Sequence, residues 1–308
     1  MTVLPRPSLI AYNGYDTGLG NRVRVVLSAQ SLAEHEGRRF YYVWPTGPRF
    51  GPRFADLWVH PTRGRVVPRA LSRGLARLYP YVDESLTWLD DAKRAERVWQ
   101  VRTGNALALP AGAAPWEDAF RALEPVPAIR ERVGRFFDAN LRGEPYVGVM
   151  IRAHTVSHRR TRETSPVEWF VERMQEIRRH DPSTRFFVSC DVPEVAARVT
   201  AAVPGSCTQL DKGAYNSTEG VRASIADLYL LASSGHLIGP HFSSFVHLAQ
   251  HLVRERLDFE TPLTQAAGPV DHRRHGVVRD PLRPAHRDVD TAPGAPSGTG
   301  AAQERRPG

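Results

Sequence analysis

The alternation of strand-like and helix-like segments is the feature that most constrains the fold of this sequence. Residues 7–12 (PSLIAY) and 40–45 (FYYVWP) have the apolar, aromatic and β-branched character of strands. The segment between them, residues 15–39, has helical spacing of its apolar side chains after a glycine turn. Strand, helix and strand in succession form the unit of a parallel sheet. The sequence therefore predicts an α/β protein.

The same alternation returns, more regularly, in the second half of the chain. The predicted strands are residues 146–152, 185–190 and 236–239, and the predicted helices are residues 165–180, 191–203, 217–235 and 243–256. Two such halves predict a pair of Rossmann-like domains that face a cleft, because ligands of these folds bind beyond the carboxyl ends of the strands.

Composition along the chain suggests three regions. We expect an N-terminal Rossmann-like domain at residues 1–142 and a C-terminal one at residues 143–266. Within the first, residues 47–115 lack clean periodicity, and residues 115–143 predict one helix that closes the domain. Residues 267–308 are rich in Pro, Gly, Ala and charge, so they cannot bury enough surface to offset their ordering entropy, and we predict a disordered tail.

Charge narrows the class of partner. The 308 residues include 41 basic side chains against 33 acidic ones, and only Lys93 and Lys212 are lysines. A GC-rich genome explains much of this arginine usage, but the planar guanidinium group is also a good phosphate ligand. A phosphate-bearing substrate is therefore expected. We do not expect a nucleic acid as partner, because the basic segment at residues 153–163 has no interleaved aromatic side chains.

Several familiar signals do not occur in the sequence. Cys190 and Cys207 have no CxxC spacing and no nearby histidine set, so we expect no metal site and no disulfide, and a reducing cytoplasm fits best. We expect neither export nor a membrane span, since no apolar run approaches the ~20 residues that cross a bilayer. A Walker lysine loop, GxGxxG, HExxH and GxSxG are all missing, which argues against those enzyme classes.

A glycine turn provides the first candidate site. Gly18, Gly20, Asn21 and Arg22 come at the predicted start of a helix. Free N–H groups at such a start can bind an anion, and Asn21 can hydrogen-bond a ligand. A simple helix cap explains the same residues equally well.

The second candidate site is at the end of the strand at residues 146–151. Arg152 follows the apolar residues directly, so its charge is fixed beside the sheet, where it can clamp a pyrophosphate. His154, two residues later, can help to neutralise the charge that develops on a leaving phosphate. Arg159 and Arg160, further along, are explained by a solvated charged surface.

Two acids and two serines complete the candidates. Asp191 ends a predicted strand, where it can accept hydrogen bonds from a purine edge or a ribose, or cap the following helix. Asp227 lies among apolar residues of a predicted helix and needs a partner, for which Arg222 is a candidate. Ser243 and Ser244 precede the last helix, where hydroxyl and N–H groups converge on an anion.

Taken in order, these segments resemble the fucosyltransferase superfamily that includes the α1,6-fucosyltransferases, the bacterial nodulation-factor fucosyltransferases and, more distantly, the α1,2- and protein O-fucosyltransferases. The glycine turn is similar to the GN(R/Q) turn of the family, VMIRA (residues 149–153) to its HxRR strand end, and SCDVP (189–193) to its TDDP strand end. The longest similarity is DLYLLASSGHLIGPHFSSF, residues 227–245, which resembles DLYLLS…DYLIGTFSSSF.

The resemblance implies a fold of the GT-B type. The first domain would be on the acceptor side, and the second would hold a GDP-sugar as co-substrate, with no metal and no cofactor. Arg152 takes the place of the arginine that binds the β-phosphate and assists the departure of GDP. Asp191 takes that of the acid that contacts guanine, and Ser243 and Ser244 those of the phosphate-binding serines. The glycine turn and Asp227 complete the expected donor site.

The sequence departs from the family pattern at two positions. Met150 replaces the histidine expected two residues before Arg152, and Ala153 replaces the second arginine. The first change affects the guanine contact, and the second weakens the phosphate clamp. For the catalytic base, Glu163 and His154 fall in the corresponding loop, and we favour Glu163 because an acid near the donor carbon could take the proton of the acceptor hydroxyl.

The function implied by the resemblance is that of a metal-independent, inverting glycosyltransferase. It would move a sugar, fucose by the resemblance, from a GDP-sugar to a hydroxyl of a small glycoside or glycan. Two alternatives stay open: a transferase that uses another nucleotide-sugar donor, and a non-catalytic nucleotide-sugar-binding protein.

Overall fold

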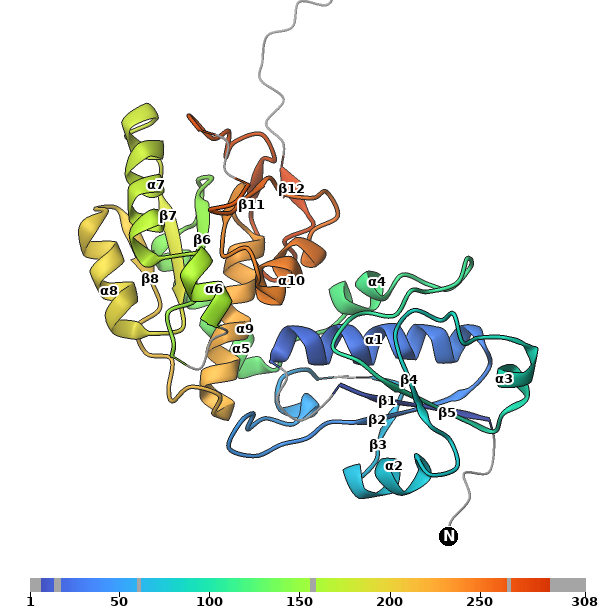
Figure 1. The fold of residues 1–308 in the computed structure, drawn as a ribbon. Coiled ribbons are helices and arrows are strands. Elements are labelled where there is room, and N and C mark those ends of the chain that lie inside the picture. The colour runs from blue at the N-terminus through green and yellow to red at the C-terminus, as the bar shows by residue number, and fades with distance from the viewer. Residues whose placement is uncertain (1–6, 14–17, 60–61, 156–158, 265–266, 289–308) are drawn as a thin grey trace, which may run out of the picture.

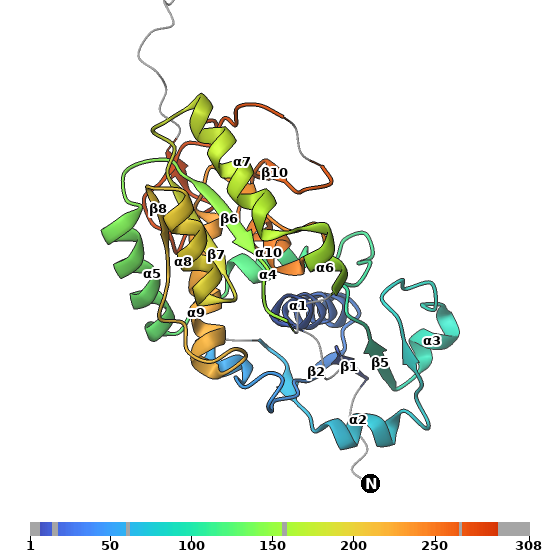
Figure 2. The same ribbon diagram turned by 60° about the vertical axis from the view of Figure 1, so that its left-hand side comes forward.

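Two parallel sheets of five strands each organise the chain in the computed structural model, which describes residues 7–13, 18–59, 62–155, 159–264 and 267–288. Helices cover both faces of each sheet, and the two sheets lie in separate halves of the molecule (Figures 1 and 2). The expected α/β fold with two Rossmann-like domains is confirmed.

The first sheet is built around the predicted strand, helix and strand unit. Its order is β3 (Arg65–Val66), β2 (Arg39–Val43), β1 (Ser8–Tyr12), β5 (Val98–Arg102) and β4 (Tyr81–Val82). Helix α1 (Leu19–His35) packs on one face, and α2 (Arg69–Leu75) lies on the opposite side of the sheet (Figure 1). Gly37, with φ of +63°, allows the tight turn from α1 into β2.

Residues 47–115, which show no clear pattern in the sequence, form short elements. Besides β3, α2, β4 and β5 they include η1 (Phe54–Asp56) and α3 (Asp91–Ala95). Strands β3 and β4 pair in parallel at the two edges of the sheet through two residues each. Two residues are too few to produce an alternation of apolar and polar side chains, so the sequence alone could not identify these strands.

The single helix expected at residues 115–143 is wrong, because two helices form there. Helix α4 (Trp116–Arg121) and helix α5 (Pro127–Asn140) are separated by a segment in which Pro125 forms a β-bridge with Trp58. Helix α5 packs against α9 (Thr218–Ala232) of the second domain, and the ring of Phe136 lies 5.4 Å from that of Phe187. The chain therefore reaches the second domain before residue 143.

The second sheet follows the predicted alternation closely. Its order is β10 (Phe259–Glu260), β9 (His236–Ile238), β6 (Val147–Ile151), β7 (Phe186–Cys190) and β8 (Ser206–Thr208). Helices α7 (Val167–His180) and α8 (Pro193–Ala202) pack on one face, and α5 and α9 on the other. The connections after β6 and β9 lead into α6 (Arg159–Thr164) and α10 (Ser244–Leu252).

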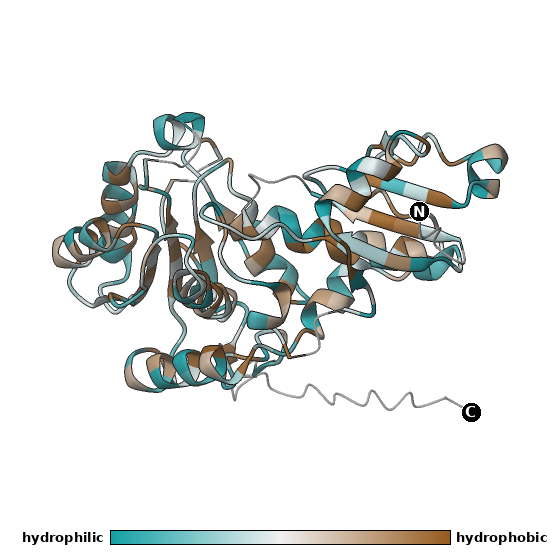
Figure 3. Cartoon of the chain, turned by 90° about the horizontal axis from the view of Figure 1, so that it is seen from below, coloured by the Kyte–Doolittle hydropathy of each residue, from teal (hydrophilic) through white to brown (hydrophobic). Residues whose placement is uncertain are grey.

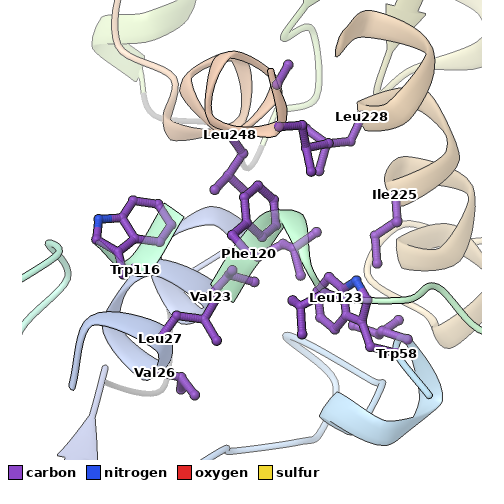
Figure 4. Packing of buried hydrophobic residues seen from close by; sticks show 14 of the residues in the cluster. Val23, Val26, Leu27, Trp58, Trp116, Phe120, Leu123, Ile225, Leu228 and Leu248 are labelled. Atoms are coloured by element: carbon purple, nitrogen blue, oxygen red, sulfur yellow. The ribbon is translucent and has the colours of Figure 1, made fainter. Parts of the chain in front are cut away.

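One apolar core joins the two domains. Leu248 of α10 and Leu228 of α9 lie near Phe120 of α4, which in turn lies over Val23 and its neighbours on α1 (Figure 4). Figure 3 shows apolar strands inside each half and hydrophilic residues on the outer helices. Among the described residues, no helix combines the length and hydrophobicity that crossing a bilayer requires.

The expected disorder from residue 267 onward is wrong for residues 267–288. This segment contains the antiparallel pair β11 (Val277–Val278) and β12 (Arg287–Asp288). Arg287 donates hydrogen bonds to the carbonyl oxygens of Ala232 and Ser234, at 2.5 and 2.9 Å. Gly235 packs so tightly on the segment that a Cβ there would lie 1.7 Å from a backbone oxygen. Specific hydrogen bonds and close packing therefore order a segment poor in large apolar residues; residues 289–308 are outside the described part.

Candidate functional site

A cavity of about 1490 Å³ lies between the two domains. The first domain contributes the start of α1 together with Arg24 and Arg49. The second contributes the ends of β6 and β7, the start of α10, and Lys212, Gly213, Tyr215 and Asn216. All of the predicted site residues line this cavity except Arg22 and Glu163. Its place beyond the carboxyl ends of parallel strands is the usual ligand position in such folds.

Arg152 and Asp191 form an ion pair at the ends of the adjacent strands β6 and β7. The guanidinium Nη1 lies 3.3 Å from Oδ2 of Asp191, and the Arg152 side chain is 31% exposed. The other carboxylate oxygen, Oδ1, accepts hydrogen bonds from the backbone N–H groups of Ala153 and His154, at 2.7 and 3.0 Å. Asp191 thus fixes the loop that carries Arg152 and orients the guanidinium beside the cavity.

An aromatic residue that sequence reasoning missed extends this group. The ring of Tyr215 stacks on that of His154, with centroids 4.0 Å apart and planes at 14°. Burial raises the pKa of Tyr215, against the opposing effect of the Arg152 charge. No motif marks Tyr215 in the sequence; only its position shortly before Ser217, the N-cap of α9, places it near a strand-to-helix connection.

Asp227 is buried at the cavity wall and is neutralised by Lys212, not by Arg222. Lys212 Nζ lies 2.5 Å from Oδ2 of Asp227, which also accepts a hydrogen bond from Ser189 Oγ at 2.7 Å. Gln209 Nε2 donates to Oδ1 at 2.6 Å. Arg222 instead pairs with Glu219 and donates to a first-domain carbonyl, because it is on another face of the helix.

The starts of two helices meet at the cavity. Gly20 in the first turn of α1 lies against Ser244 at the start of α10, and a Cβ on Gly20 would be 2.7 Å from Ser244 Oγ. Ser243 is the N-cap residue of α10, but its hydroxyl makes no capping hydrogen bond. The positive ends of two helix dipoles therefore converge, which suits an anion.

Arg22 has a different environment from the rest of the glycine turn. Its side chain is completely buried; Nη1 donates to the carbonyl oxygen of Pro45 at 2.6 Å, and the guanidinium lies 4.2 Å from the centre of the Phe50 ring and 5.4 Å from that of Trp44. This arginine holds the start of α1 to the loop after β2. It supports the wall of the cavity without lining it.

Glu163 is also outside the cavity lining. It lies on α6, where its carboxylate is 2.6 Å from Nε of Arg159, four residues earlier on the same helix, and both side chains are largely exposed. Of the two catalytic bases considered from the sequence, only His154 lines the cavity.

Other cavity residues escaped sequence reasoning because no motif marks them. Arg24 donates from Nε to the carbonyl oxygen of Gly104 at 2.7 Å, and His247 is on the first turn of α10. Burial lowers the pKa of His247, against a hydrogen bond with Gln250 that raises it, and the nearby cations Arg256 and Arg24 lower it further. The cavity wall therefore includes cationic, imidazole and acidic groups.

Of the two cysteines, Cys190 lines the cavity. Cys190 and Cys207 form no disulfide, and burial raises the pKa of each thiol to about 11. Within the described ranges, no three His, Cys, Asp or Glu side chains come together as a metal site would require.

Comparison with known proteins identifies the architecture. No family model and no curated protein matches the sequence. Among solved structures, the α1,6-fucosyltransferase NodZ soaked with GDP-fucose matches with a TM-score of 0.54 and 19% identity, over 80% of this chain and 93% of NodZ. NodZ from Bradyrhizobium gives 0.52 and 16%, over 79% and 93% of the two chains. The apo form of POFUT1 gives 0.52 and 13%, over 85% and 99%.

The matched structures include fucosyltransferases, the family that the sequence motifs resemble. The matches extend through both domains and cover nearly the whole length of the other chains. Because the sequence identity is 19% or lower, these matches establish the fold and nothing further. The chain therefore has the two-domain GT-B fold of these fucosyltransferases.

Proposed function

We propose that the protein is a glycosyltransferase that takes its sugar from a GDP-sugar, with fucose as the sugar. The observation that carries the proposal is the geometry of Arg152, which Asp191 orients beside a cavity where two helix starts converge. A nucleoside diphosphate carries the charge that such a group of donors binds. NodZ structures with GDP-fucose and with GDP give additional support for this choice of donor.

The proposed reaction is a direct displacement with inversion. The acceptor hydroxyl oxygen attacks the anomeric carbon while the bond from that carbon to the β-phosphate oxygen breaks, and GDP departs. Arg152 and the N–H groups at the starts of α1 and α10 stabilise the charge that develops on the diphosphate. His154 takes the proton of the acceptor hydroxyl, because of the two candidate bases, Glu163 and His154, it is the one that lines the cavity.

No metal is needed in this proposal, because the protein supplies the positive charge itself. The acceptor is a hydroxyl of a small glycoside or glycan. Phe242 and Tyr215 line the cavity with 41% and 36% of their surface exposed, and such rings offer apolar faces to a sugar. The reducing cytoplasm is the proposed compartment, in line with the two thiols.

Calorimetric titration tests the donor proposal. The purified protein is titrated with GDP, UDP, CDP and ADP, first in EDTA and then in magnesium. We expect GDP to bind, with the same affinity in both buffers. Preference for UDP would identify another nucleotide-sugar donor, consistent with Met150 in place of the histidine. A lack of binding by all four would overturn the proposal.

Turnover is measured separately, because a non-catalytic binding protein would also pass the titration. The protein is incubated with GDP-fucose and a panel of small glycosides, and release of GDP is followed. Acceptor-dependent release of GDP is the expected result. Binding of GDP-fucose without release across the panel would favour the binding protein.

A further inference from the structure

The loop between β8 and α9 brings a buried lysine to the cavity wall. Lys212 is one of only two lysines in the chain, and it is 9% exposed. Its Nζ donates to Oδ2 of Asp227 at 2.5 Å and to the carbonyl oxygen of Cys190 at 2.9 Å. An ammonium group has three N–H donors, and the third has no partner among the described residues. A ligand in the cavity can therefore accept it.

Neighbouring contacts hold this ammonium group in one position. Gln209 donates to the other oxygen of Asp227, and its own amide oxygen accepts a hydrogen bond from Nε of Arg132 at 2.5 Å. The orientation of the Gln209 amide is therefore fixed, and with it that of the carboxylate. Because Asp227 is held from both sides, Lys212 loses little conformational freedom when a ligand binds.

The position of Lys212 matters because of Met150. Met150 is the register partner of Ser189 on the neighbouring strand, so their side chains point to the same face of the sheet. Ser189 Oγ and Lys212 Nζ both donate to the same oxygen of Asp227. Met150 lines the same cavity but offers no N–H or O–H donor. The donor that the family pattern has at position 150 is missing, and an ammonium group lies nearby.

We propose that Lys212 reads the base of the nucleotide donor by donating a hydrogen bond to a keto oxygen, such as O6 of guanine. This inference rests on the proposed function and assigns one part of the base selection at that site, namely keto bases over amino bases. An ammonium group can only donate hydrogen bonds. It can therefore bind a keto oxygen, but not the exocyclic amino group that adenine and cytosine carry at the equivalent position, because that group is also a donor. Asp227 is a positioning residue that orients Lys212. Lys212 therefore favours nucleotides whose base has a keto group at this position over those whose base has an amino group.

Calorimetry with a base analogue tests this assignment. The probes are GDP and the diphosphate of 2-aminopurine riboside, which lacks the 6-oxo oxygen and, with it, the hydrogen on N1; the ratio measured on the Lys212 variant separates these two changes. For the unmodified protein we expect the analogue to bind about tenfold more weakly, as expected for loss of a hydrogen bond to a charged group. Equal affinities would overturn the proposal without any variant.

The variant Lys212→Met then assigns the effect to one side chain. We expect its affinity for GDP to fall about tenfold and the ratio between the two probes to fall to within about twofold. Lys93→Met is the matched control: Lys93 pairs with Glu96 outside the cavity lining, and both affinities should be unchanged. Thermal melting verifies that each variant is folded. A ratio in Lys212→Met equal to that of the unmodified protein would contradict the role of Lys212.

Two further results separate this proposal from the one on which it rests. If GDP binds but the ratio does not respond to Lys212→Met, the donor proposal stands and the assignment of Lys212 fails. If no diphosphate binds, both fail. If Lys212→Met does not fold because Asp227 loses its cation, the double variant Lys212→Met/Asp227→Asn removes that unpaired charge, and the same ratio is measured on it.

Discussion

Arg22 and Arg152 were both expected to bind an anion, and the structure gives them opposite environments. Arg22, in the first domain, is buried against a carbonyl oxygen and aromatic rings. Arg152, in the second domain, is partly exposed and paired with a carboxylate beside the cavity. Arg22 thus holds the shape of the cavity wall, whereas Arg152 supplies charge to the cavity. Substitutions at these two arginines and at neighbouring residues test this division.

The substitution Arg152→Ala should cause the largest loss of activity. Removing a charge-stabilising donor typically costs about 3 to 4 kcal/mol, or about 10²- to 10³-fold in turnover. Initial rates of GDP release measure it. The control is Arg159→Ala, an exposed arginine outside the cavity lining, which should keep its activity. Full activity in Arg152→Ala would remove the basis of the proposed mechanism.

The substitution Arg22→Ala should act on stability. It deletes a fully buried side chain with its hydrogen bond and ring contacts, and we expect a loss of about 2 to 3 kcal/mol in the free energy of unfolding. Urea denaturation measures this, with exposed Arg63→Ala as control. Unchanged stability together with loss of GDP affinity would show that Arg22 contacts the ligand after all.

The substitution Gly20→Ala should have a smaller effect on both properties. The new Cβ would come 2.7 Å from Ser244 Oγ and 3.2 Å from its backbone oxygen, so the two helix starts must separate slightly. We expect a cost of about 1 kcal/mol in stability and a few-fold loss of GDP affinity. At Gly18 a Cβ would meet nothing within 4 Å, so Gly18→Ala is the matched control for the effect on stability. Equal behaviour of the two variants would argue against a tight contact.

The substitution Glu163→Gln should have the smallest effect. Glu163 pairs with Arg159 on the surface of α6, and exposed pairs of this kind contribute about 0.3 to 0.5 kcal/mol. We expect turnover within about twofold of the unmodified enzyme, whereas His154→Ala should be strongly impaired. If the glutamine variant loses activity at unchanged GDP affinity, Glu163 is the base and His154 is not.

The regular elements of the fold could be predicted from the sequence, and the short or long-range ones could not. Strands of five residues with continuous apolar runs, such as β6, leave a clear pattern. The ordering of residues 267–288 depends on contacts such as Arg287 with Ala232, which are 55 residues apart. No local pattern encodes a hydrogen bond to a distant carbonyl, and the composition of the segment alone indicated disorder.

Prediction of the candidate site from the sequence was limited in the same way. Residues inside motifs at strand ends, such as Arg152 and Asp191, could be named from the sequence and line the cavity. Lys212 is in a loop without a motif, and only the pairing of β7 with β8 brings it to Asp227. Arg22 could have been recognised as buried, because it is four residues before Val26 and therefore on the apolar side of the helix.

The apolar core that joins α1 and α4 to α9 and α10 has a consequence for engineering. Exchanging one domain for that of a relative requires a cut in the chain between the two sheets. Here a cut near residue 142 would separate α5 from β6 and divide a continuous core, leaving Phe120 and Leu228 uncovered on different fragments. A chimera that keeps its solubility must therefore transplant both halves of this interface together, because neither domain keeps its core covered on its own.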